Sequence, residues 1–302
     1  MTPELTANGN SDWIESSDLG LAIELCEKFN RGKLYEVFGE YAELSSKALA
    51  ERGAKCWLCY EGNKLSGFAL LRRLELGTAG FNVLEEMWAP FDGLFGDTLQ
   101  MTAMDRRRIQ AFKSQVMRHA GETLLMRGSI ENHFAHGVAR GLSLAWFNGL
   151  VLGERKLQEK QGKLKIPPAY DIREFIPGDE SFFSKLHLEV YSEEFSSKVF
   201  RNWATSDHCR CTVATHSGNP VGFIIAEKRP YKSIGDFYLA VSPSHHRRGV
   251  GGALLDAAVY ASYEMGVRRM IADYRTINGA THALYEGRGF KPVRVYNYFR
   301  IR

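Results

Sequence analysis

The feature that most constrains the fold of this chain is an internal repeat. Residues 56–68 (CWLCYEGNKLSGF) align without a gap on residues 211–223 (CTVATHSGNPVGF). Each copy has an apolar run, a turn containing glycine and asparagine, and a second run that opens with Gly-Phe, which predicts a β-hairpin. A second match links residues 140–142 (RGL) with residues 288–290 (RGF), and both predict a helix end followed by a strand. We therefore expect two copies of one fold along the chain.

The length of the chain agrees with this repeat, because 302 residues are about twice the ~150 of a typical domain. We expect one domain at residues 1–152, a linker at residues 153–168 and a second domain at residues 169–302. The expected linker combines the charged run ERKLQEKQGKLK with the stiff pair Pro167-Pro168. With 44% hydrophobic and 25% charged residues, the composition is that of a globular protein and excludes a disordered or fibrous chain.

The net charge, the apolar runs and the cysteine content of the chain indicate which partners and which cellular compartment to expect. A formal net charge of +4 over 302 residues gives no reason to expect nucleic acid as a partner. No apolar run reaches the ~18 residues of a membrane span and no signal peptide is recognisable, so we expect a cytoplasmic protein with no membrane partner. The odd number of cysteines, 5, predicts reduced thiols. Cys56 and Cys59 lie in an apolar run, where strand packing is favoured over redox chemistry.

The candidate binding site lies in residues 234–266, where a predicted strand is followed by a loop rich in glycine and cations and then by a predicted helix. Glycine lets the backbone approach a ligand closely, and the free N–H groups at a helix start bind anions. The expected ligand is therefore a phosphate or pyrophosphate. The glycine spacing fits neither a Walker loop nor a dinucleotide fingerprint. The candidate binding residues of the loop are His246, Arg247, Arg248, Gly249, Val250, Gly251 and Gly252.

Two motifs in this half resemble those of the GNAT (N-acetyltransferase) superfamily. The run PSHHRRGVGGALL, which follows Val241 and Ser242, is similar to the family's acyl-CoA pyrophosphate loop, with His246 where glutamine or arginine is usual. Residues 278–290 are similar to its N-x-x-A-x-x-L-Y-x-x-x-G-F segment, with Thr281 in place of alanine. The resemblance implies an α/β (mixed, α+β-like) fold class with two tandem GNAT folds. Each is expected to be a mixed, mostly antiparallel twisted sheet flanked by helices.

The resemblance also implies a reaction, the direct transfer of an acetyl group from acetyl-CoA, as cosubstrate, to a primary amine of a small molecule or peptide. It implies that the backbone near Leu239 and Val241 contacts acetyl-CoA, and that Asn278 contributes to the same site. Backbone N–H groups there would stabilise the oxygen on which charge grows in the transition state. By similarity, Tyr285 would protonate the departing CoA thiolate as a general acid.

The general base is less well defined by the sequence. Asp236 is the candidate, on the strand that leads to the loop, whereas the family glutamate usually stands one position earlier, at Gly235. One residue along a strand turns a side chain to the opposite face, unless a bulge intervenes. Glu193 and Glu194, in the region that usually contacts the acceptor, and a relay through water are the alternatives.

Several histidines have simpler explanations than catalysis or metal binding. His245 and His282 can titrate near neutrality, but a loop histidine beside arginines is expected to be solvated or to contact phosphate. His133 and His136, with Glu131, have spacing that a metal could use on a helix, but no second ligand cluster accompanies them. We therefore expect structural packing there, no metal site and no metal cofactor.

The first copy of the repeat lacks the loop. After its Trp88-Ala89-Pro90, no closely spaced glycines or cations precede the next predicted helix, and Gly137 occupies the place of Tyr285. We expect a degenerate N-terminal copy that keeps the scaffold but not acetyl transfer. Two alternatives stay open: a non-catalytic acyl-CoA-binding protein that acts as a sensor or regulator, and an enzyme that modifies proteins rather than small molecules. The acceptor and the formation of a homodimer are also left open.

Overall fold

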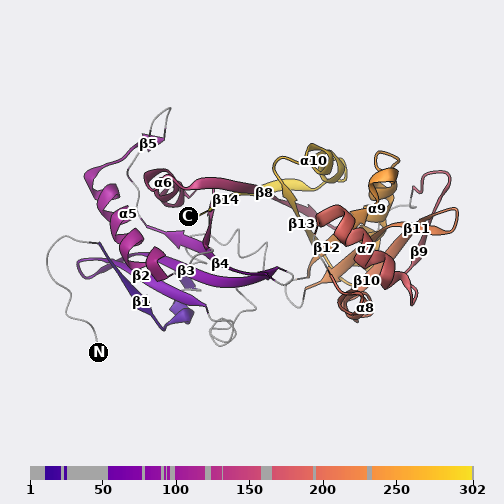
Figure 1. Ribbon diagram of the computed structural model, residues 1–302, viewed down its shortest axis with the longest axis horizontal. Coiled ribbons are helices and arrows are strands. Elements are labelled where there is room, and N and C mark those ends of the chain that lie inside the picture. Colours follow the sequence, from indigo (N-terminus) through magenta and orange to yellow (C-terminus); the bar gives the residue numbers. More distant parts are fainter. Residues whose placement is uncertain are drawn as a thin grey trace. The chain divides into compact units, whose positions relative to one another are not determined.

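The computed structural model describes residues 11–21, 24–25, 54–76, 79–89, 92, 94–95, 99–119, 124–130, 132–157, 165–192, 195–229 and 233–300 (Figure 1). The chain forms two compact units. The N-terminal unit comprises Met1–Leu150 and Arg294–Arg302, and the C-terminal unit comprises Val151–Val293.

The N-terminal unit is built on a sheet with strand order β1-β2-β3-β4-β7-β14. The neighbouring strands are antiparallel except β4 and β7, which are parallel. The helices and strands that begin in this half of the sequence are β1 Ser11–Ser16, β2 Lys55–Glu61, β3 Lys64–Leu76, β4 Ala79–Trp88, β5 Leu94–Phe95, β6 Leu99–Gln100, α5 Ala103–Gln115, a 3₁₀ turn at Met117–His119, β7 Leu124–Ser129, α6 His133–Gly141 and β8 Ala145–Lys156.

The C-terminal unit repeats this plan with strand order β9-β10-β11-β12-β13-β8. Strands β9 to β12 pair antiparallel, whereas β12 and β13 are parallel. The elements of this half are β9 Tyr170–Glu174, α7 Asp179–Tyr191, α8 Ser197–Ala204, β10 Cys209–His216, β11 Asn219–Lys228, β12 Ile234–Val241, a 3₁₀ turn at Pro243–His245, α9 Val250–Glu264, β13 Arg269–Arg275, α10 Gly279–Glu286 and β14 Lys291–Arg300.

The hairpin repeat expected from the sequence is present in both units. The first copy forms β2 and β3, and the second forms β10 and β11. Each hairpin carries a β-bulge, one between Cys59 and Tyr60 and the other between Ala214 and Thr215, which are matching positions of the aligned segments. A bulge bends a strand and increases its twist. The two hairpins therefore share a local distortion as well as a residue pattern.

The last strand of each half of the sequence contributes to the other unit. β8 follows α6, yet its residues from Val151 onward are part of the C-terminal unit. β14 follows α10, yet its residues from Arg294 onward are part of the N-terminal unit, where they pair with β7. The expected linker at residues 153–168 thus begins inside a strand, and residues 294–302 lie outside the unit expected for them. Residue patterns predict where strands occur but do not say which distant strand each one joins.

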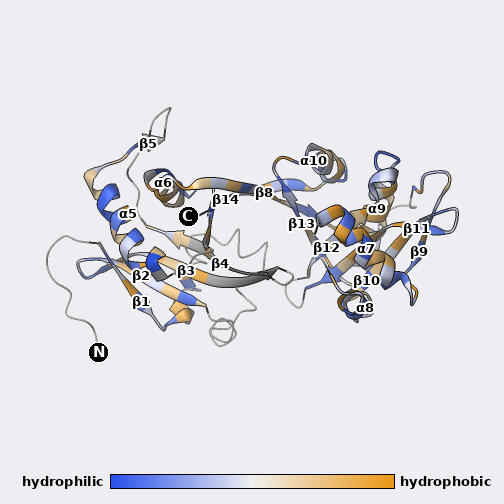
Figure 2. Cartoon of the chain, in the orientation of Figure 1, coloured by the Kyte–Doolittle hydropathy of each residue, from blue (hydrophilic) through white to orange (hydrophobic). Residues whose placement is uncertain are grey.

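The second hairpin shows how a sheet of this fold is covered on both faces. Phe223 of β11 packs with Phe183 of α7 and Phe200 of α8 in one hydrophobic core. Successive side chains of a strand alternate between the faces, so Gly222 points to the other face. A Cβ at Gly222 would lie 3.2 Å from Leu254 of α9, which packs there. Hydrophobic residues recur along these strands and along α9 (Figure 2).

The cysteines of the described chain are buried thiols. Cys56 and Cys59 belong to different hydrophobic cores, because residues three apart on a strand point to opposite faces. Burial raises the pKa of Cys56 to about 12 and that of Cys59 to about 11, so both stay protonated. Packing in a strand is thereby confirmed for this pair, and Cys26 lies outside the described residues. Within the described ranges, no helix has the length and apolar character needed to cross a bilayer.

Candidate functional site

Strands β12 and β13 run side by side only where they begin. Their paired residues are Ile234 with Arg269 and Gly235 with Met270. β12 continues to Val241 and stays paired with β11 along its length. The two parallel strands therefore diverge after Gly235, and the edge of β12 beyond this point is not paired with β13.

The backbone of β12 presents alternate residues at this unpaired edge. The N–H of Ser242 donates to the carbonyl of Val221 at 2.8 Å, which fixes the register with β11. Because hydrogen-bonded pairs alternate in an antiparallel ladder, the N–H and C=O groups of Leu239 and Val241 point away from β11. The hydroxyl of Tyr191 accordingly donates to the carbonyl oxygen of Leu239 at 2.8 Å. This edge thus carries N–H groups that are oriented to bind an oxygen atom of a ligand.

The start of helix α9 is the second element of the candidate site. Its N-cap residue is Gly249, whose φ of 82° lies in the left-handed region that glycine adopts without a steric penalty. Among the described residues, no side chain caps the first turn. The N–H groups of Val250, Gly251 and Gly252 are therefore oriented toward an anion, at the positive end of the helix dipole.

The side chains of the loop differ in what they do. Arg247 and Arg248 are exposed, and Arg247 has a positive φ of 59°. The Nε2 atom of His246 lies 2.9 Å from the carbonyl oxygen of Val241, so this side chain folds back on the end of β12. We expect the two arginines to contribute charge and His246 to contribute only its backbone to a phosphate site.

Arg288 is a cation of this region that the sequence analysis did not select. Its Nε donates to the carbonyl oxygen of Gly252 at 3.0 Å and lies 3.1 Å from Oδ1 of Asp256 in α9. Arg155 of β8 lies near Arg288 and Asp256. Burial lowers the pKa of Arg155, the positive charge of Arg288 lowers it further, and the carboxylate of Asp256 opposes this shift. The only sequence feature that pointed to Arg288 was its place in the repeated Arg-Gly pair.

Tyr285, the predicted general acid, lies on α10 and is buried among aromatic rings. Its ring centroid is 5.4 Å from that of Phe237, 5.2 Å from that of Tyr274 and 5.9 Å from that of Phe290. Burial raises the pKa of Tyr285 above its ordinary value, and the nearby Tyr191 hydroxyl adds to this effect. A raised pKa keeps the phenol protonated at neutral pH, which a proton donor requires.

Helix α7 brings a second aromatic group to β12 that the sequence analysis missed. His187 is buried and its Nδ1 is hydrogen-bonded to the hydroxyl of Tyr238 on β12. The ring of Tyr191 lies 5.1 Å from that of His187 and 5.3 Å from that of Tyr238. The spacing of four residues between His187 and Tyr191, which places both on one helix face, is the pattern that could have indicated them.

Asp236, the candidate base, is not a free carboxylate. It forms an ion pair with Arg229, whose Nε lies 3.0 Å from Oδ2 of Asp236. Gly235, at the usual place of the family glutamate, is buried, and a Cβ there would lie 3.0 Å from the carbonyl oxygen of Glu227. A glutamate could therefore not replace this glycine without a shift of the strands. The alternatives Glu193 and Glu194 lie outside the described residues.

The remaining polar candidates have local partners. The side chain of Asn278 caps α10 by accepting a hydrogen bond from the N–H of Thr281 at 3.1 Å. The Nδ1 of His245 lies 3.0 Å from the hydroxyl of Tyr170. Burial, together with His216 and Arg248, lowers the pKa of His245. Its imidazole is therefore neutral at pH 7 and adds no charge to the loop.

In the N-terminal unit the helix that corresponds to α9 is α5, and side chains cap its first turn. Thr102 is the N-cap of α5, and its hydroxyl accepts a hydrogen bond from the N–H of Asp105 at 3.1 Å. The carboxylate of Asp105 accepts in return from the N–H of Thr102 at 2.8 Å and from the N–H of Asp92 at 3.0 Å. An anionic side chain of the protein thus already occupies the start of α5.

The protein-family comparison also distinguishes the two halves of the chain, because its match lies in the C-terminal half. The model of the Acetyltransferase (GNAT) family matches residues 178–290, from the turn before α7 to the end of the α10 motif. No curated protein sequence is significantly similar to this chain.

Solved structures share the fold of the chain over almost its whole length. A GCN5-related N-acetyltransferase from Sphaerobacter thermophilus is 15% identical with a TM-score of 0.63, covering 96% of this chain and 95% of its own. A tandem GNAT protein from the clavulanic acid biosynthesis pathway is 14% identical with a TM-score of 0.56, covering 97% and 98%. A GNAT family acetyltransferase from Colwellia psychrerythraea is 14% identical with a TM-score of 0.57, covering 97% and 100%. Residues 178–290 therefore match the Acetyltransferase (GNAT) family, and the chain as a whole shares the fold of these GNAT structures, a tandem GNAT protein among them.

Proposed function

We propose that this protein is an acetyl-CoA-dependent N-acetyltransferase with one active site, in the C-terminal unit. The observation that carries the proposal is the pairing of two backbone features in that unit. The first turn of α9 has no side-chain cap among the described residues, and the diverging edge of β12 presents the N–H groups of Leu239 and Val241. The helix start suits the pyrophosphate of acetyl-CoA, and the strand edge suits its pantetheine and thioester oxygen.

In the proposed reaction, the nitrogen of a neutral amine attacks the thioester carbonyl carbon. A C–N bond forms, the C–S bond breaks, and the phenol of Tyr285 gives its proton to the departing thiolate. The raised pKa of Tyr285 means that the phenol carries its proton when the thiolate departs. Tyr285 regains its proton from solvent after CoA leaves.

Asp236 on β12 is the proposed acceptor of the proton that the nitrogen loses after its attack. Its ion pair with Arg229 engages one carboxylate oxygen, Oδ2, so we propose that solvent shares this role.

The N-terminal unit is proposed to serve as a scaffold. Asp105 occupies the start of α5, so a second pyrophosphate would meet a carboxylate there rather than free N–H groups. Gly137, at the position that matches Tyr285, has no group that could donate a proton. The buried free thiols fit a reducing compartment, and the cytoplasm is the proposed location.

A non-catalytic acyl-CoA sensor is the second candidate, and one observation favours it. The strand position where the resemblance leads one to expect a glutamate is the buried Gly235, and the neighbouring Asp236 forms an ion pair with Arg229. A sensor would bind acetyl-CoA as an enzyme does but would release no CoA with any amine.

Two measurements on the full chain separate these readings. Release of CoA, followed with a thiol reagent across amines, amino acids, aminoglycosides and peptide N-termini, is expected to exceed hydrolysis for at least one acceptor. Calorimetry is expected to give one acetyl-CoA per chain. Binding without release for every acceptor supports the sensor, and two molecules per chain contradict the single site.

A glycine variant tests the placement of the pyrophosphate. A Cβ at Gly251 would lie 3.6 Å from Leu284, an ordinary contact, so Gly251→Ala is expected to fold normally while its methyl group obstructs the ligand. The matched control is Gly279→Ala, at the start of α10, where a Cβ would meet nothing within 4 Å. We expect at least a tenfold loss of acetyl-CoA affinity only in Gly251→Ala. Equal affinity in both variants would place the pyrophosphate elsewhere.

A further inference from the structure

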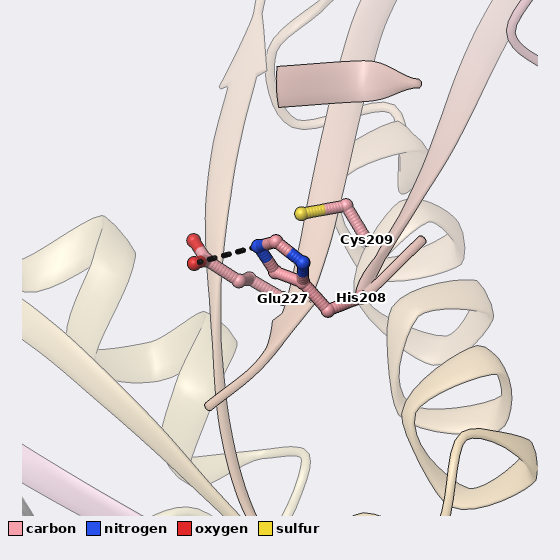
Figure 3. A group of neighbouring side chains, drawn as sticks. All are labelled: His208, Cys209 and Glu227. Atoms are coloured by element: carbon pink, nitrogen blue, oxygen red, sulfur yellow. Dashed lines mark ion pairs between the residues drawn. The ribbon is translucent and has the colours of Figure 1, made fainter. Parts of the chain in front are cut away.

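Three metal-ligating side chains of different chemistry meet at one end of the β10–β11 hairpin. They are His208, Cys209 and Glu227, which offer an imidazole nitrogen, a sulfur atom and a carboxylate oxygen (Figure 3). The three ligand atoms all lie within 4.8 Å of one another. In the described part of the chain this is the group with such geometry, whereas Glu131, the expected partner of His133 and His136, lies outside the described residues.

Strand pairing holds two of these ligands together. Cys209, the first residue of β10, is directly opposite Glu227 of β11 in the antiparallel ladder. Directly opposed residues project to the same face of a sheet with Cβ atoms about 4.5–5.5 Å apart. Because the backbone fixes this pair, their separation does not depend on a flexible loop.

The third ligand approaches the same carboxylate. The Nε2 of His208 lies 3.7 Å from Oε1 of Glu227. Tetrahedral zinc, with bonds of about 2.0–2.3 Å to nitrogen, oxygen and sulfur, needs ligand atoms about 3.3–3.8 Å apart. The nitrogen and the oxygen, 3.7 Å apart, lie near the upper end of this range, and the sulfur lies within 4.8 Å of both, so the ligands would have to draw together slightly on binding.

Neighbouring polar groups orient the ligands. The indole N–H of Trp203 donates to Oε2 of Glu227 at 3.0 Å, which directs the other oxygen, Oε1, toward His208. The hydroxyl of Ser206 is 2.8 Å from Nδ1 of His208 and 3.2 Å from Nε2. A hydrogen bond to the non-ligating nitrogen of a histidine, and to the second oxygen of a carboxylate, is typical of the outer shell of metal sites.

The charges around the cluster favour a cation. Glu227 stands directly opposite Asp236 of β12, and like charges at such positions destabilise a sheet. Arg229 lies between them, 3.6 Å from Oε1 of Glu227 and in an ion pair with Asp236. A cation bound at Glu227 would add to the compensation that Arg229 gives these two carboxylates.

The thiol of Cys209 responds to the same charges. Burial raises its pKa to about 11, and the carboxylates of Glu227 and Asp236 add to the effect. Without a metal, Cys209 is therefore a protonated thiol at neutral pH. A bound cation would reverse this preference, because metal coordination stabilises the thiolate.

We propose that His208 Nε2, Cys209 Sγ and Glu227 Oε1 bind a Zn²⁺ ion, with water as the fourth ligand on the exposed side of His208. Binding forms the Zn–S bond and releases the thiol proton to solvent, while the metal keeps its oxidation state. The mixed nitrogen, sulfur and oxygen donor set is one that zinc accepts, whereas magnesium and calcium prefer oxygen alone. The three ligands are not among the proposed acyl-transfer residues, although Arg229 links Glu227 to Asp236, and the proposal does not depend on that function.

The bound ion would join three elements of the C-terminal unit. Cys209 and His208 stand at the start of β10, Glu227 stands near the end of β11, and Trp203 attaches the site to α8. Binding to the folded state alone raises stability by mass action. Zinc is therefore expected to raise the unfolding temperature of the protein, in proportion to how tightly it binds.

The proposal is tested on the full reduced chain with Zn²⁺ alone, in competition with a chromogenic chelator, and with Co²⁺ as a spectroscopic probe. The chain is expected to bind one Zn²⁺ that both Cys209→Ala and His208→Ala weaken at least tenfold. Co²⁺ is expected to show a thiolate charge-transfer band that Cys209→Ala abolishes. The matched control is Cys211→Ala, a buried cysteine on the same strand and outside the cluster, which is expected to retain affinity and band.

The outcomes separate the metal site from the ion pair between His208 and Glu227. No zinc binding by the unmodified chain, or an affinity that His208→Ala and Cys209→Ala leave unchanged, overturns the proposal. His208 has a side chain that is 57% exposed, so its variant is expected to fold even if a change at buried Cys209 disturbs the hairpin. Acetyl transfer is not part of the readout, so its absence would not affect the result.

Discussion

The guanidinium of Arg288 lies against the backbone of Gly252 in the first turn of α9. Its Nε donates to the Gly252 carbonyl oxygen at 3.0 Å. A Cβ at Gly252 would overlap the guanidinium, so only glycine lets this cation reach the helix start. Gly252 thus lets Arg288 place a positive charge beside N–H groups that no side chain caps in the described chain.

Removing this cation should weaken acetyl-CoA binding. We expect Arg288→Ala to lower the affinity about tenfold, since a hydrogen bond to a charged group contributes about 1.5–3 kcal/mol and 1.4 kcal/mol corresponds to a factor of ten. Gly252→Ala should have a similar effect because its methyl group displaces the guanidinium. Calorimetry measures both, with Arg268→Ala, which lies beyond the other end of α9, as the control. Unchanged affinity in Arg288→Ala would assign the arginine to packing alone.

Tyr285→Phe should separate chemistry from binding. Loss of a general acid typically costs 10²–10⁴ in rate, so kcat is expected to fall at least a hundredfold while acetyl-CoA affinity stays constant. Because burial raises the pKa of Tyr285, its proton is retained above the usual pKa of 10, and activity should not decline between about pH 8 and 10. Tyr274→Phe, a buried neighbour with a ring centroid 5.2 Å away, is the control. A Tyr285→Phe enzyme with the rate of the control would reject the proton-donor role.

The sequence predicted the parts of this fold that depend on local pattern. The hairpin at residues 56–68 and its copy, the helix from Val250 and the loop before it all appear where alternation, glycines and capping placed them. It did not predict that β14 would join the N-terminal unit, because pairing over more than a hundred residues is decided by packing. Nor did it predict the ion pair between Arg229 and Asp236, since strand register brings these residues together. The contacts of Arg288 with α9 and of Tyr191 with β12 join different elements and were not predicted either.

The capping box of α5 predicts an acid-sensitive stability of the N-terminal unit. Burial alone would raise the pKa of Asp105, but hydrogen bonds from Asp92 and Thr102 outweigh it and hold the pKa below the ordinary 3.8. A carboxyl with a lowered folded-state pKa stabilises the fold at pH values above 3.8, and this contribution is lost as the pH falls through the folded-state pKa.

We therefore expect Asp105→Asn to lower the free energy of unfolding by about 1–3 kcal/mol at pH 7. The substitution weakens the cap of α5 and removes the ion pair between Asp105 and the buried Arg108. The difference from the unmodified chain should shrink as the pH falls below 3.8 and through the lowered folded-state pKa of Asp105. Urea unfolding at pH 7 and at a series of pH values below 3.8 measures this. Asp92→Asn, whose side chain is 64% exposed, serves as the control and should change stability by less than about 1 kcal/mol. A pH-independent difference would contradict the assignment.

Strand β14 leads to a prediction about stability, because its residues from Arg294 onward belong to the N-terminal unit. The domain boundaries expected from the sequence would lead to the opposite prediction. Phe299 of β14 is 8% exposed and packs in a core of the N-terminal unit with Trp13 and Phe134. Truncating a buried phenylalanine to alanine costs about 3–5 kcal/mol. Phe299→Ala should therefore open the N-terminal unit to proteases first, although the substitution is at the C-terminal end of the chain. Val293→Ala, an exposed position in the same strand, is the control. Limited proteolysis with mass spectrometry locates the cuts, and early cleavage within β9 to β13 would show that β14 supports the C-terminal unit instead.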